Sequence, residues 1–175
     1  MGAAPSTEHG IAKAWAKFSS YKNELTDKQI PLYLRLKLFH SVVTPSMLYG
    51  CAAWVMTQHR DQALRSTEMR MMRAILGRKR LVTKLGEPEE PVVETWVEWV
   101  RRATAEAREA MRIHNVPDWV EEQRGNVLQW NEKLEQMELT RWARQVRDWI
   151  PEGRRPRGHP CMRWADQLQK ATLSR

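Results

Sequence analysis

The chain has 175 residues, enough for one ordinary domain, and its 29 lysines and arginines outnumber 21 aspartates and glutamates, giving a formal net charge of +8. No run of about 18 uninterrupted apolar residues occurs, so we expect no membrane-spanning helix. The N-terminal stretch "MGAAPSTEHG" has neither the charged start nor the apolar run of a secretory leader, so secretion is not expected. The cysteines, Cys51 and Cys161, lack partners at the short spacings that zinc sites use. We therefore expect reduced thiols, an intracellular location (nuclear or cytoplasmic), and neither metal nor cofactor.

The charge is segregated along the chain. Residues 1–84 hold 14 basic and 5 acidic side chains, residues 85–135 hold 6 and 12, and residues 136–175 hold 9 and 4. Two basic blocks around an acidic middle suggest a polyanion partner, RNA or DNA, although a solvated arginine-rich surface would give the same pattern. We accordingly divide the chain into a basic helical region (1–84), a helical extension (85–150) and a basic tail (151–175).

The N-terminal half predicts three helices. A first helix from Ile11 to Leu25 puts three large apolar side chains on one face. Pro31 opens a second helix, and Pro45 is expected to kink or end it. A third is expected from Gln58 to Leu76, with Gly77 as its C-cap. The apolar stripe of the second helix consists of Leu32, Leu36, Phe39 and Val43.

The second half continues at helical spacing. A stripe from Val92 to Met111 predicts a helix, Pro117 starts another, and shorter segments cover 139–149 and 164–168. No alternating run predicts a strand, so the expected fold class is all-α: an irregular helical bundle with a Pro/Gly/Arg-rich C-terminal tail. Most of the nine tryptophans fall on these stripes, where core packing is the expected role.

We find no self-contained catalytic constellation. Two-metal phosphoryl chemistry needs carboxylates that converge on paired ions, whereas the five aspartates are isolated from one another. The Pro-Asp pair at 117–118 resembles one of restriction-type nucleases but lacks the strand-borne carboxylate and lysine that should follow. Phosphate-binding glycine loops and nucleophile elbows are also absent from the sequence. No catalytic or metal-binding residue is therefore assigned.

Arginines are the strongest candidates for function. Their planar guanidinium groups suit bidentate contact with phosphate, and the prolines and glycines of "GRRPRGHP" (153–160) favour an extended backbone that could follow a strand. An exposed linker is the alternative interpretation of that segment. The predicted nucleic-acid-binding residues are Arg70, Arg73, Arg78, Lys79, Arg80, Arg141, Arg144, Arg147, Arg154, Arg155, Arg157 and Arg163.

Three segments resemble one protein family in order. "RLKLFHSVVTPSMLYGCAAW" (35–54), "MRMMRAILGRKR" (69–80) and "GRRPRGHPCMRWAD" (153–166) are similar to the region downstream of the palm in non-LTR (LINE-like) retrotransposon reverse transcriptases. The sequence departs from the family at Ala52, where many relatives have an acidic residue, and at His159, where arginine is frequent. The aromatic-Ala-Asp-Asp turn of the palm has no counterpart here, and neither has the family's endonuclease.

The resemblance implies a thumb-like region and C-terminal extension that grip template and primer. On this hypothesis the chain is a fragment of a reverse transcriptase that binds nucleic acid non-specifically and catalyses nothing alone. Its partners would be RNA, DNA and the palm of a parent enzyme, which we expect to be encoded upstream of Met1. Two alternatives stay open: a stand-alone or decayed interaction protein acting through the acidic 85–135 segment, and, ranked last, an active nuclease.

Overall fold

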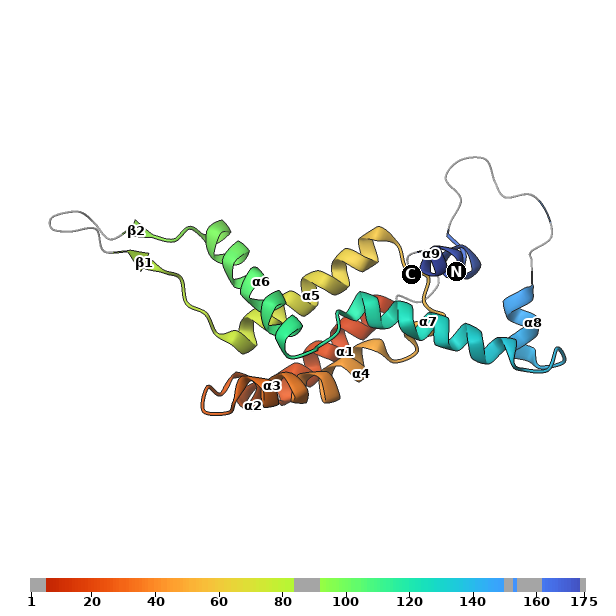
Figure 1. Ribbon diagram of the computed structural model, residues 1–175, viewed down its shortest axis with the longest axis horizontal. Coiled ribbons are helices and arrows are strands. Elements are labelled where there is room, and N and C mark those ends of the chain that lie inside the picture. Colours follow the sequence, from red (N-terminus) through yellow and green to blue (C-terminus); the bar gives the residue numbers. More distant parts are fainter. Residues whose placement is uncertain (1–5, 84–91, 150–152, 154–161, 174–175) are drawn as a thin grey trace.

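The computed structural model describes residues 6–83, 92–149, 153 and 162–173. Within these ranges the chain is helical, apart from one short antiparallel pair, β1 (Val82–Thr83) and β2 (Val92–Val93). The molecule is elongated, with this pair at one end and the short helix α8 (Trp142–Asp148) at the other (Figure 1). The all-α fold class is confirmed. Among the described helices, none has the length and apolar character that crossing a bilayer requires.

The first predicted helix is two helices in the structure. α1 (Ser6–Ser20) and α2 (Lys22–Thr26) are separated at Tyr21, whose backbone (φ −113°, ψ 21°) leaves the helical region. The expected apolar face is nevertheless used, since Phe18 and Leu25 are buried. The break lets α2 turn back to pack on α3 (Leu32–Leu38).

Pro45 does not end the second helix. α3 passes into a wider π-helical turn, Phe39–Val43, and then into α4 (Thr44–Leu48), which carries Pro45 in its first turn. Proline cannot donate a backbone hydrogen bond to the preceding turn, and the wider turn directly before it accommodates that loss. Gly50 then adopts a left-handed conformation (φ 69°) ahead of a short 3-10 turn, Cys51–Ala53.

α5 (Gln58–Leu76) has the predicted boundaries, and both ends are capped by their own sequence. At the start, the Thr57 hydroxyl accepts a hydrogen bond from the Arg60 backbone N–H at 3.3 Å. At the end, Gly77 takes the left-handed conformation (φ 59°) and donates its N–H to the Arg73 carbonyl. Local sequence is therefore sufficient to determine this helix.

α6 (Trp96–Ile113) and α7 (Trp119–Glu135) are also capped locally. Thr95 and Glu98 form a reciprocal capping box at the start of α6. The prediction that the helix begins at Val92 is wrong, because Val92 and Val93 pair in β2 before this cap. The Asp118 carboxylate accepts the first backbone N–H groups of α7, which explains the Pro-Asp pair as a helix start. The last helix is α9 (Trp164–Leu173).

The core lies between α1, α3, α4 and α5 and is closed by the first turn of α7. Trp119 is fully buried and stacks on Phe39, with ring centroids 5.7 Å apart and planes 9° from parallel. Its indole N–H donates to the Thr44 hydroxyl at 3.0 Å, so the polar atom of the ring is satisfied inside the core. This one side chain anchors α7 to the N-terminal helices.

The expectation that most tryptophans pack in the core is wrong. Of the described tryptophans only Trp54 and Trp119 are buried, whereas Trp96, Trp142 and Trp149 are 63%, 77% and 68% exposed. The stripes of α6 and α8 extend past the elements that could cover them, and no residue of α8 is buried. Helical spacing identified one apolar face in each case but could not show how much of that face has a partner.

Candidate nucleic-acid interface

A groove of about 700 Å³ lies between α5, α6 and the middle of α7. Helices from the basic region and from the acidic extension both contribute to it. Its walls are formed by Gln58, Asp61, Gln62, Arg65, Ser66, Met69, Arg70 and Arg73 of α5, by Val100, Thr104 and Arg108 of α6, and by Arg124 of α7.

Helical spacing brings these side chains onto the groove. Val100, Thr104 and Arg108 follow at intervals of four along α6, so they share one face of that helix. The facing helix α5 presents Arg73, whose guanidinium donates to the Thr104 hydroxyl at 2.9 Å. This hydrogen bond ties the two walls together about midway along α6. The groove is therefore a fixed feature of the packing of α5 against α6.

The groove holds five arginines and one carboxylate. Asp61 is engaged by Arg124 (3.3 Å), and Arg65 reaches Asp118 outside the groove at 3.7 Å. Among the described residues, neither Arg70 nor Arg108 has a carboxylate partner; Arg70 instead lies over the Trp15 ring, 5.5 Å from its centroid. The groove therefore carries uncompensated positive charge, which favours an anionic ligand.

The pKa of Arg73 also reflects the positive charge of the groove. Burial lowers the pKa of Arg73, and the positive charge of neighbouring Arg70 lowers it further. Arginine stays protonated despite such shifts. Two adjacent guanidinium groups that repel each other, one of them partly desolvated, would both be stabilised by a phosphate between them.

Three further predicted residues follow α5. Arg78 is held by Glu106 at 2.7 Å, and the Arg80 guanidinium donates to the backbone carbonyl of Glu94 at 2.7 Å. Lys79 is exposed, and none of the described residues forms an ion pair with it. The Arg102 guanidinium binds Glu94 at 2.8 Å and holds the pKa of that carboxyl down at about 2, so the carboxylate is already neutralised by this chain. Arg78 thus ties the segment after α5 to α6, Arg80 supports the β1–β2 pair, and Lys79 has no ion-pair partner among the described residues.

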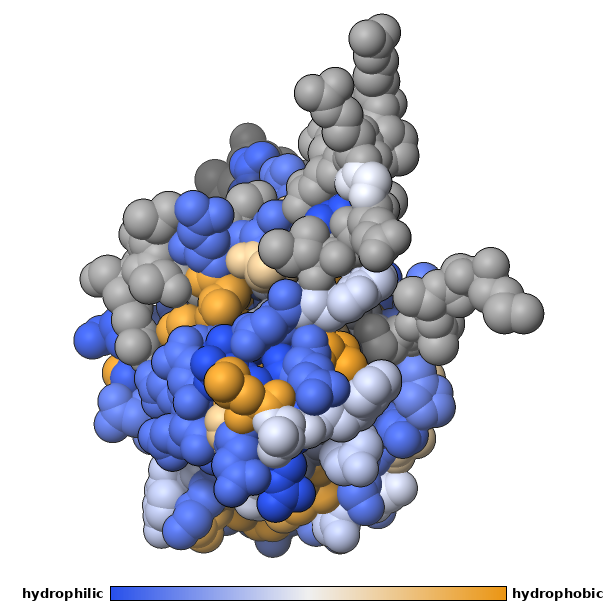
Figure 2. All heavy atoms as spheres, turned by 90° about the vertical axis from the view of Figure 1, so that its right-hand side faces the viewer, coloured by the Kyte–Doolittle hydropathy of each residue, from blue (hydrophilic) through white to orange (hydrophobic). Residues whose placement is uncertain are grey.

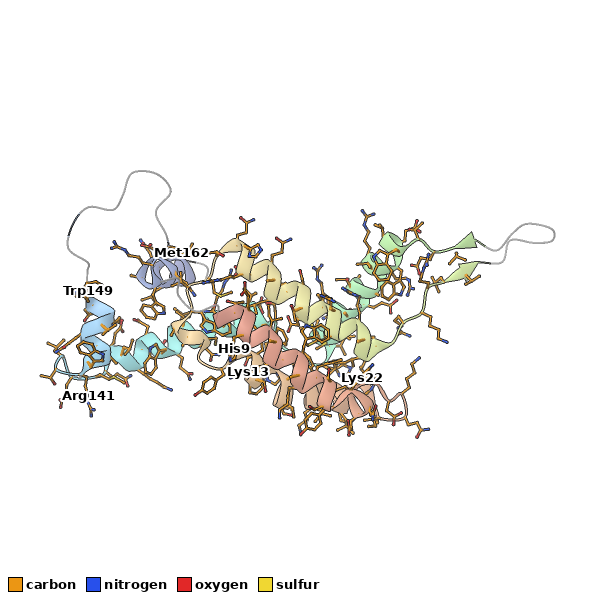
Figure 3. The ribbon with its side chains drawn as sticks, turned by 180° about the vertical axis from the view of Figure 1, so that it is seen from behind. His9, Lys13, Lys22, Arg141, Trp149 and Met162 are labelled. Atoms are coloured by element: carbon orange, nitrogen blue, oxygen red, sulfur yellow. The ribbon has the colours of Figure 1, made fainter. Side chains whose placement is uncertain are left out.

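The arginines of α8 have structural partners. Arg144 donates to the Leu134 carbonyl at 2.8 Å in the last turn of α7 and pairs with Asp148 at 3.1 Å. Arg147 pairs with Asp148 at 2.6 Å and donates to Asn131 at 3.3 Å. Their side chains are only 17% and 16% exposed. These contacts cap α7 and fasten α8 to it. Arg141 is exposed at the N-terminal end of α8, opposite Trp149 (Figure 3).

The predicted tail residues Arg154, Arg155 and Arg157 lie outside the described residues. Arg163 borders a second pocket of about 480 Å³ between α7, α8 and α9, which shares no lining residue with the arginine groove. That pocket is mainly apolar, and its walls include the indoles of Trp130, Trp149 and Trp164. Trp164 is held there by a hydrogen bond from its N–H to the Ala52 carbonyl at 2.8 Å.

Sequence analysis missed part of the groove. Arg108 and Arg124 belong to the segment with net negative charge, and Arg65 was not among the predicted binding residues. A net charge summed over a block hides cations on one helix face when the anions lie on another. The four-residue spacing of Val100, Thr104 and Arg108 could have identified Arg108, but nothing local identifies Arg124.

Beneath the groove, α5 carries a buried carboxyl group. Glu68 is fully buried; one of its oxygens accepts the Trp119 backbone N–H at 3.3 Å, and the other has no hydrogen-bond partner among the described residues. Burial, reinforced by the nearby charge of Asp118, raises its pKa to about 9, so the group is protonated at neutral pH. Within the described ranges no cluster of carboxyl, His or Cys side chains has a metal-binding arrangement.

Comparison with known proteins gives one informative match. The chain is 28% identical over 167 residues to a protein of Caenorhabditis elegans whose name describes it as transposon-derived and uncharacterized. The match covers 93% of this chain and 52% of that protein, so the chain spans about half the length of this relative. This chain is similar to a transposon-derived protein. No family model and no solved structure matches it.

Proposed function

We propose that this chain binds RNA or DNA through the arginine groove and belongs to the region downstream of the palm of a retrotransposon-type reverse transcriptase. Three observations support the proposal: the three motifs that resemble that family, the similarity to a transposon-derived protein, and the groove itself. The groove carries the argument, because Arg70, Arg73 and Arg108 share it with a single carboxylate that another arginine already neutralises.

Binding in this groove is sequence-tolerant. Guanidinium groups along α5 and α6 contact phosphate oxygens, and phosphate contacts position a strand without reading its bases. Hydroxyl and amide groups of Ser66, Thr104 and Gln62 line the same surface and can donate to further phosphate oxygens. An RNA or DNA partner, and the free buried thiol of Cys51, support an intracellular location, nuclear or cytoplasmic. A palm from a parent enzyme would be the second partner.

The test removes one groove arginine from each of two helices. Arg108→Ala in α6 and Arg70→Ala in α5 should each lower the steepness of the plot of log affinity against log salt by about 0.7 to 0.9, for one lost phosphate contact. Arg112→Ala is the matched control: it lies one helical turn beyond Arg108, pairs with Glu109 at 2.5 Å, and lies outside the groove. The measurement is fluorescence anisotropy with labelled oligonucleotides at several salt concentrations.

An equal slope for Arg108→Ala and Arg112→Ala would contradict a phosphate site in this groove. The tail can be examined in the same assay by replacing Arg154, Arg155 and Arg157 together. A change of slope there would assign a phosphate contact to the tail, and no change would support the interpretation of that segment as a linker.

Protein–protein interaction is the second candidate function. In the described part of the acidic segment, residues 92–135, several carboxylates are already engaged, since Glu94, Glu106 and Glu109 pair with arginines of this chain. The α8 end is the better surface, because Leu139, Trp142, Val146 and Trp149 are exposed there. Figure 2 shows separate apolar patches among mainly hydrophilic side chains on this end of the molecule. Association through this end should resist high salt, whereas nucleic-acid binding should not.

A further inference from the structure

Two exposed indoles lie at the start of α6. The rings of Trp96 and Trp99 are 4.7 Å apart at an angle of 34°, and Trp96 is 63% exposed. The Trp99 indole N–H donates to the Arg78 carbonyl at 3.0 Å, which holds that ring in place. Trp96 rests against it and leaves much of its surface open. An exposed large aromatic side chain held by a second one is costly to leave in water and suits a planar partner.

The charges around this pair also suit an anionic partner. Lys79 and Arg101 are exposed, and no ion pair within the described part of the chain engages either of them. The nearby carboxylates are already satisfied. Glu94 binds Arg102 at 2.8 Å, and Glu98 accepts hydrogen bonds from the Thr95 hydroxyl and N–H at 2.7 and 2.9 Å. Glu98 keeps its negative charge, since its Thr95 partners are neutral, and Lys79 and Arg101 together leave a net positive charge beside the indoles.

Trp96 lies one helical turn before the groove along α6. It precedes Val100, the first groove residue of that helix, by four residues, whereas Trp99 lies on the neighbouring flank and points to the Arg78 carbonyl. Eight residues separate Trp96 from Thr104, about 12 Å along a helix. A strand whose phosphates occupy the groove can reach the indoles within a few nucleotides.

We propose that Trp96 and Trp99 form a stacking platform for unpaired bases at one end of the arginine groove, so that the bound partner is single-stranded nucleic acid or a single-stranded part of a longer one. This inference rests on the proposed function. Bases in a duplex are already stacked on their neighbours, whereas an unpaired base is free to lie on an indole. Stacking accepts every base, in keeping with the sequence-tolerant phosphate contacts.

The experiment uses the whole chain and three labelled DNA probes of about 16 nucleotides: a thymidine strand, an abasic strand that retains its phosphates, and a duplex. Trp96→Ala should weaken binding of the thymidine strand about five-fold or more, since one base stacked on an aromatic ring contributes about 1 to 3 kcal/mol. Binding of the abasic strand should stay unchanged, and Trp96→Phe should restore most of the loss.

Val97→Ala is the matched control, because Val97 is the adjacent exposed apolar residue (55%) on the same helix turn. Equal weakening of the thymidine and abasic strands by Trp96→Ala would overturn the platform and assign Trp96 a structural role. Unchanged binding in Trp96→Ala, together with weakened binding in Arg108→Ala, would overturn the platform and leave the proposed function intact. Failure of the unaltered protein to bind any probe would overturn both.

Discussion

Glu68 shows how one residue can make the stability of this fold depend on pH. Its carboxyl is buried between α5 and α7 and is surrounded by Asp118, Glu122, Arg65 and the Trp119 N–H. Burial also raises the pKa of Glu122, against the effect of His40 at 3.9 Å. Both groups therefore bind protons more tightly in the folded protein than in the unfolded chain. Stability from such groups is complete below the unfolded pKa and is lost as pH rises through the folded pKa.

We expect the free energy of unfolding to fall between about pH 5 and pH 9, by up to about 1.4 kcal/mol per pH unit for one proton. Glu68→Gln keeps the hydrogen bond from the Trp119 N–H and removes the titration, so it should flatten this dependence. Urea denaturation at several pH values measures how the free energy of unfolding depends on pH. Glu121→Gln, at an exposed glutamate in the first turn of α7, is the control and should keep the slope of the unaltered protein. A Glu68→Gln protein with the original slope would show that other groups cause the dependence.

At the scale of secondary-structure elements, α1 and α4 approach each other closely at a glycine. A Cβ at Gly10 would lie 2.7 Å from the Met47 carbonyl oxygen and 3.1 Å from the Trp54 ring. Backbone atoms of a packed helix cannot move away cheaply, so the α1–α4 contact requires the absence of a side chain at this position. Gly125, in the middle of α7, has no atom within 4 Å of its Cβ position.

These two glycines give opposite predictions for one substitution. Gly125→Ala should stabilise the protein by about 0.5 to 1 kcal/mol, the usual gain of alanine over glycine inside a helix. Gly10→Ala should destabilise it, because the clash between helices exceeds that gain. The midpoint temperature of thermal unfolding, monitored by circular dichroism, measures the change in each variant. Stabilisation in both variants would mean that α1 and α4 are not in close contact.

At the scale of the whole molecule, the groove depends on three separate helices. α5 supplies three of its five arginines, α6 closes it through the contact of Arg73 with Thr104, and Arg124 reaches it from α7. The described carboxylates that lie near it, Asp61 and Asp118, bind arginines of this chain. This arrangement suits holding a strand and offers no converging acids for metal-assisted phosphoryl transfer.

We expect the isolated chain to extend no primer and cleave no nucleic acid in the presence of Mg²⁺ or Mn²⁺. The measurement is incubation of purified protein with an annealed primer–template, followed by gel electrophoresis, with heat-denatured protein as the control. Shorter products above that control would restore the nuclease alternative, and longer products would show a polymerase activity that the proposal denies to the isolated chain.

The sequence by itself determined the helices and where several of them begin and end. Helix caps bond to backbone groups within a few residues, so a short stretch of sequence is enough to identify them. Gly77, Thr57 and the Thr95–Glu98 pair are caps of this kind. Helical spacing also identified which residues of α3 and the π-helical turn enter the core, since Leu36, Phe39 and Val43 are buried. The basic surface for a polyanion partner, which composition suggested, stays a prediction, and the transposon origin that the motif order suggested agrees with the similarity to a transposon-derived protein.

Only the tertiary structure decided which apolar faces are covered and which arginines are free. Trp119 is buried because α7 docks on Phe39, whereas Trp96 stands beyond the reach of α5. The side chains of Arg144 and Arg147 donate hydrogen bonds to α7. Arg108, from the acidic segment, is exposed in the groove. Burial and pairing depend on contacts between residues tens of positions apart, and helical periodicity contains no information about those contacts.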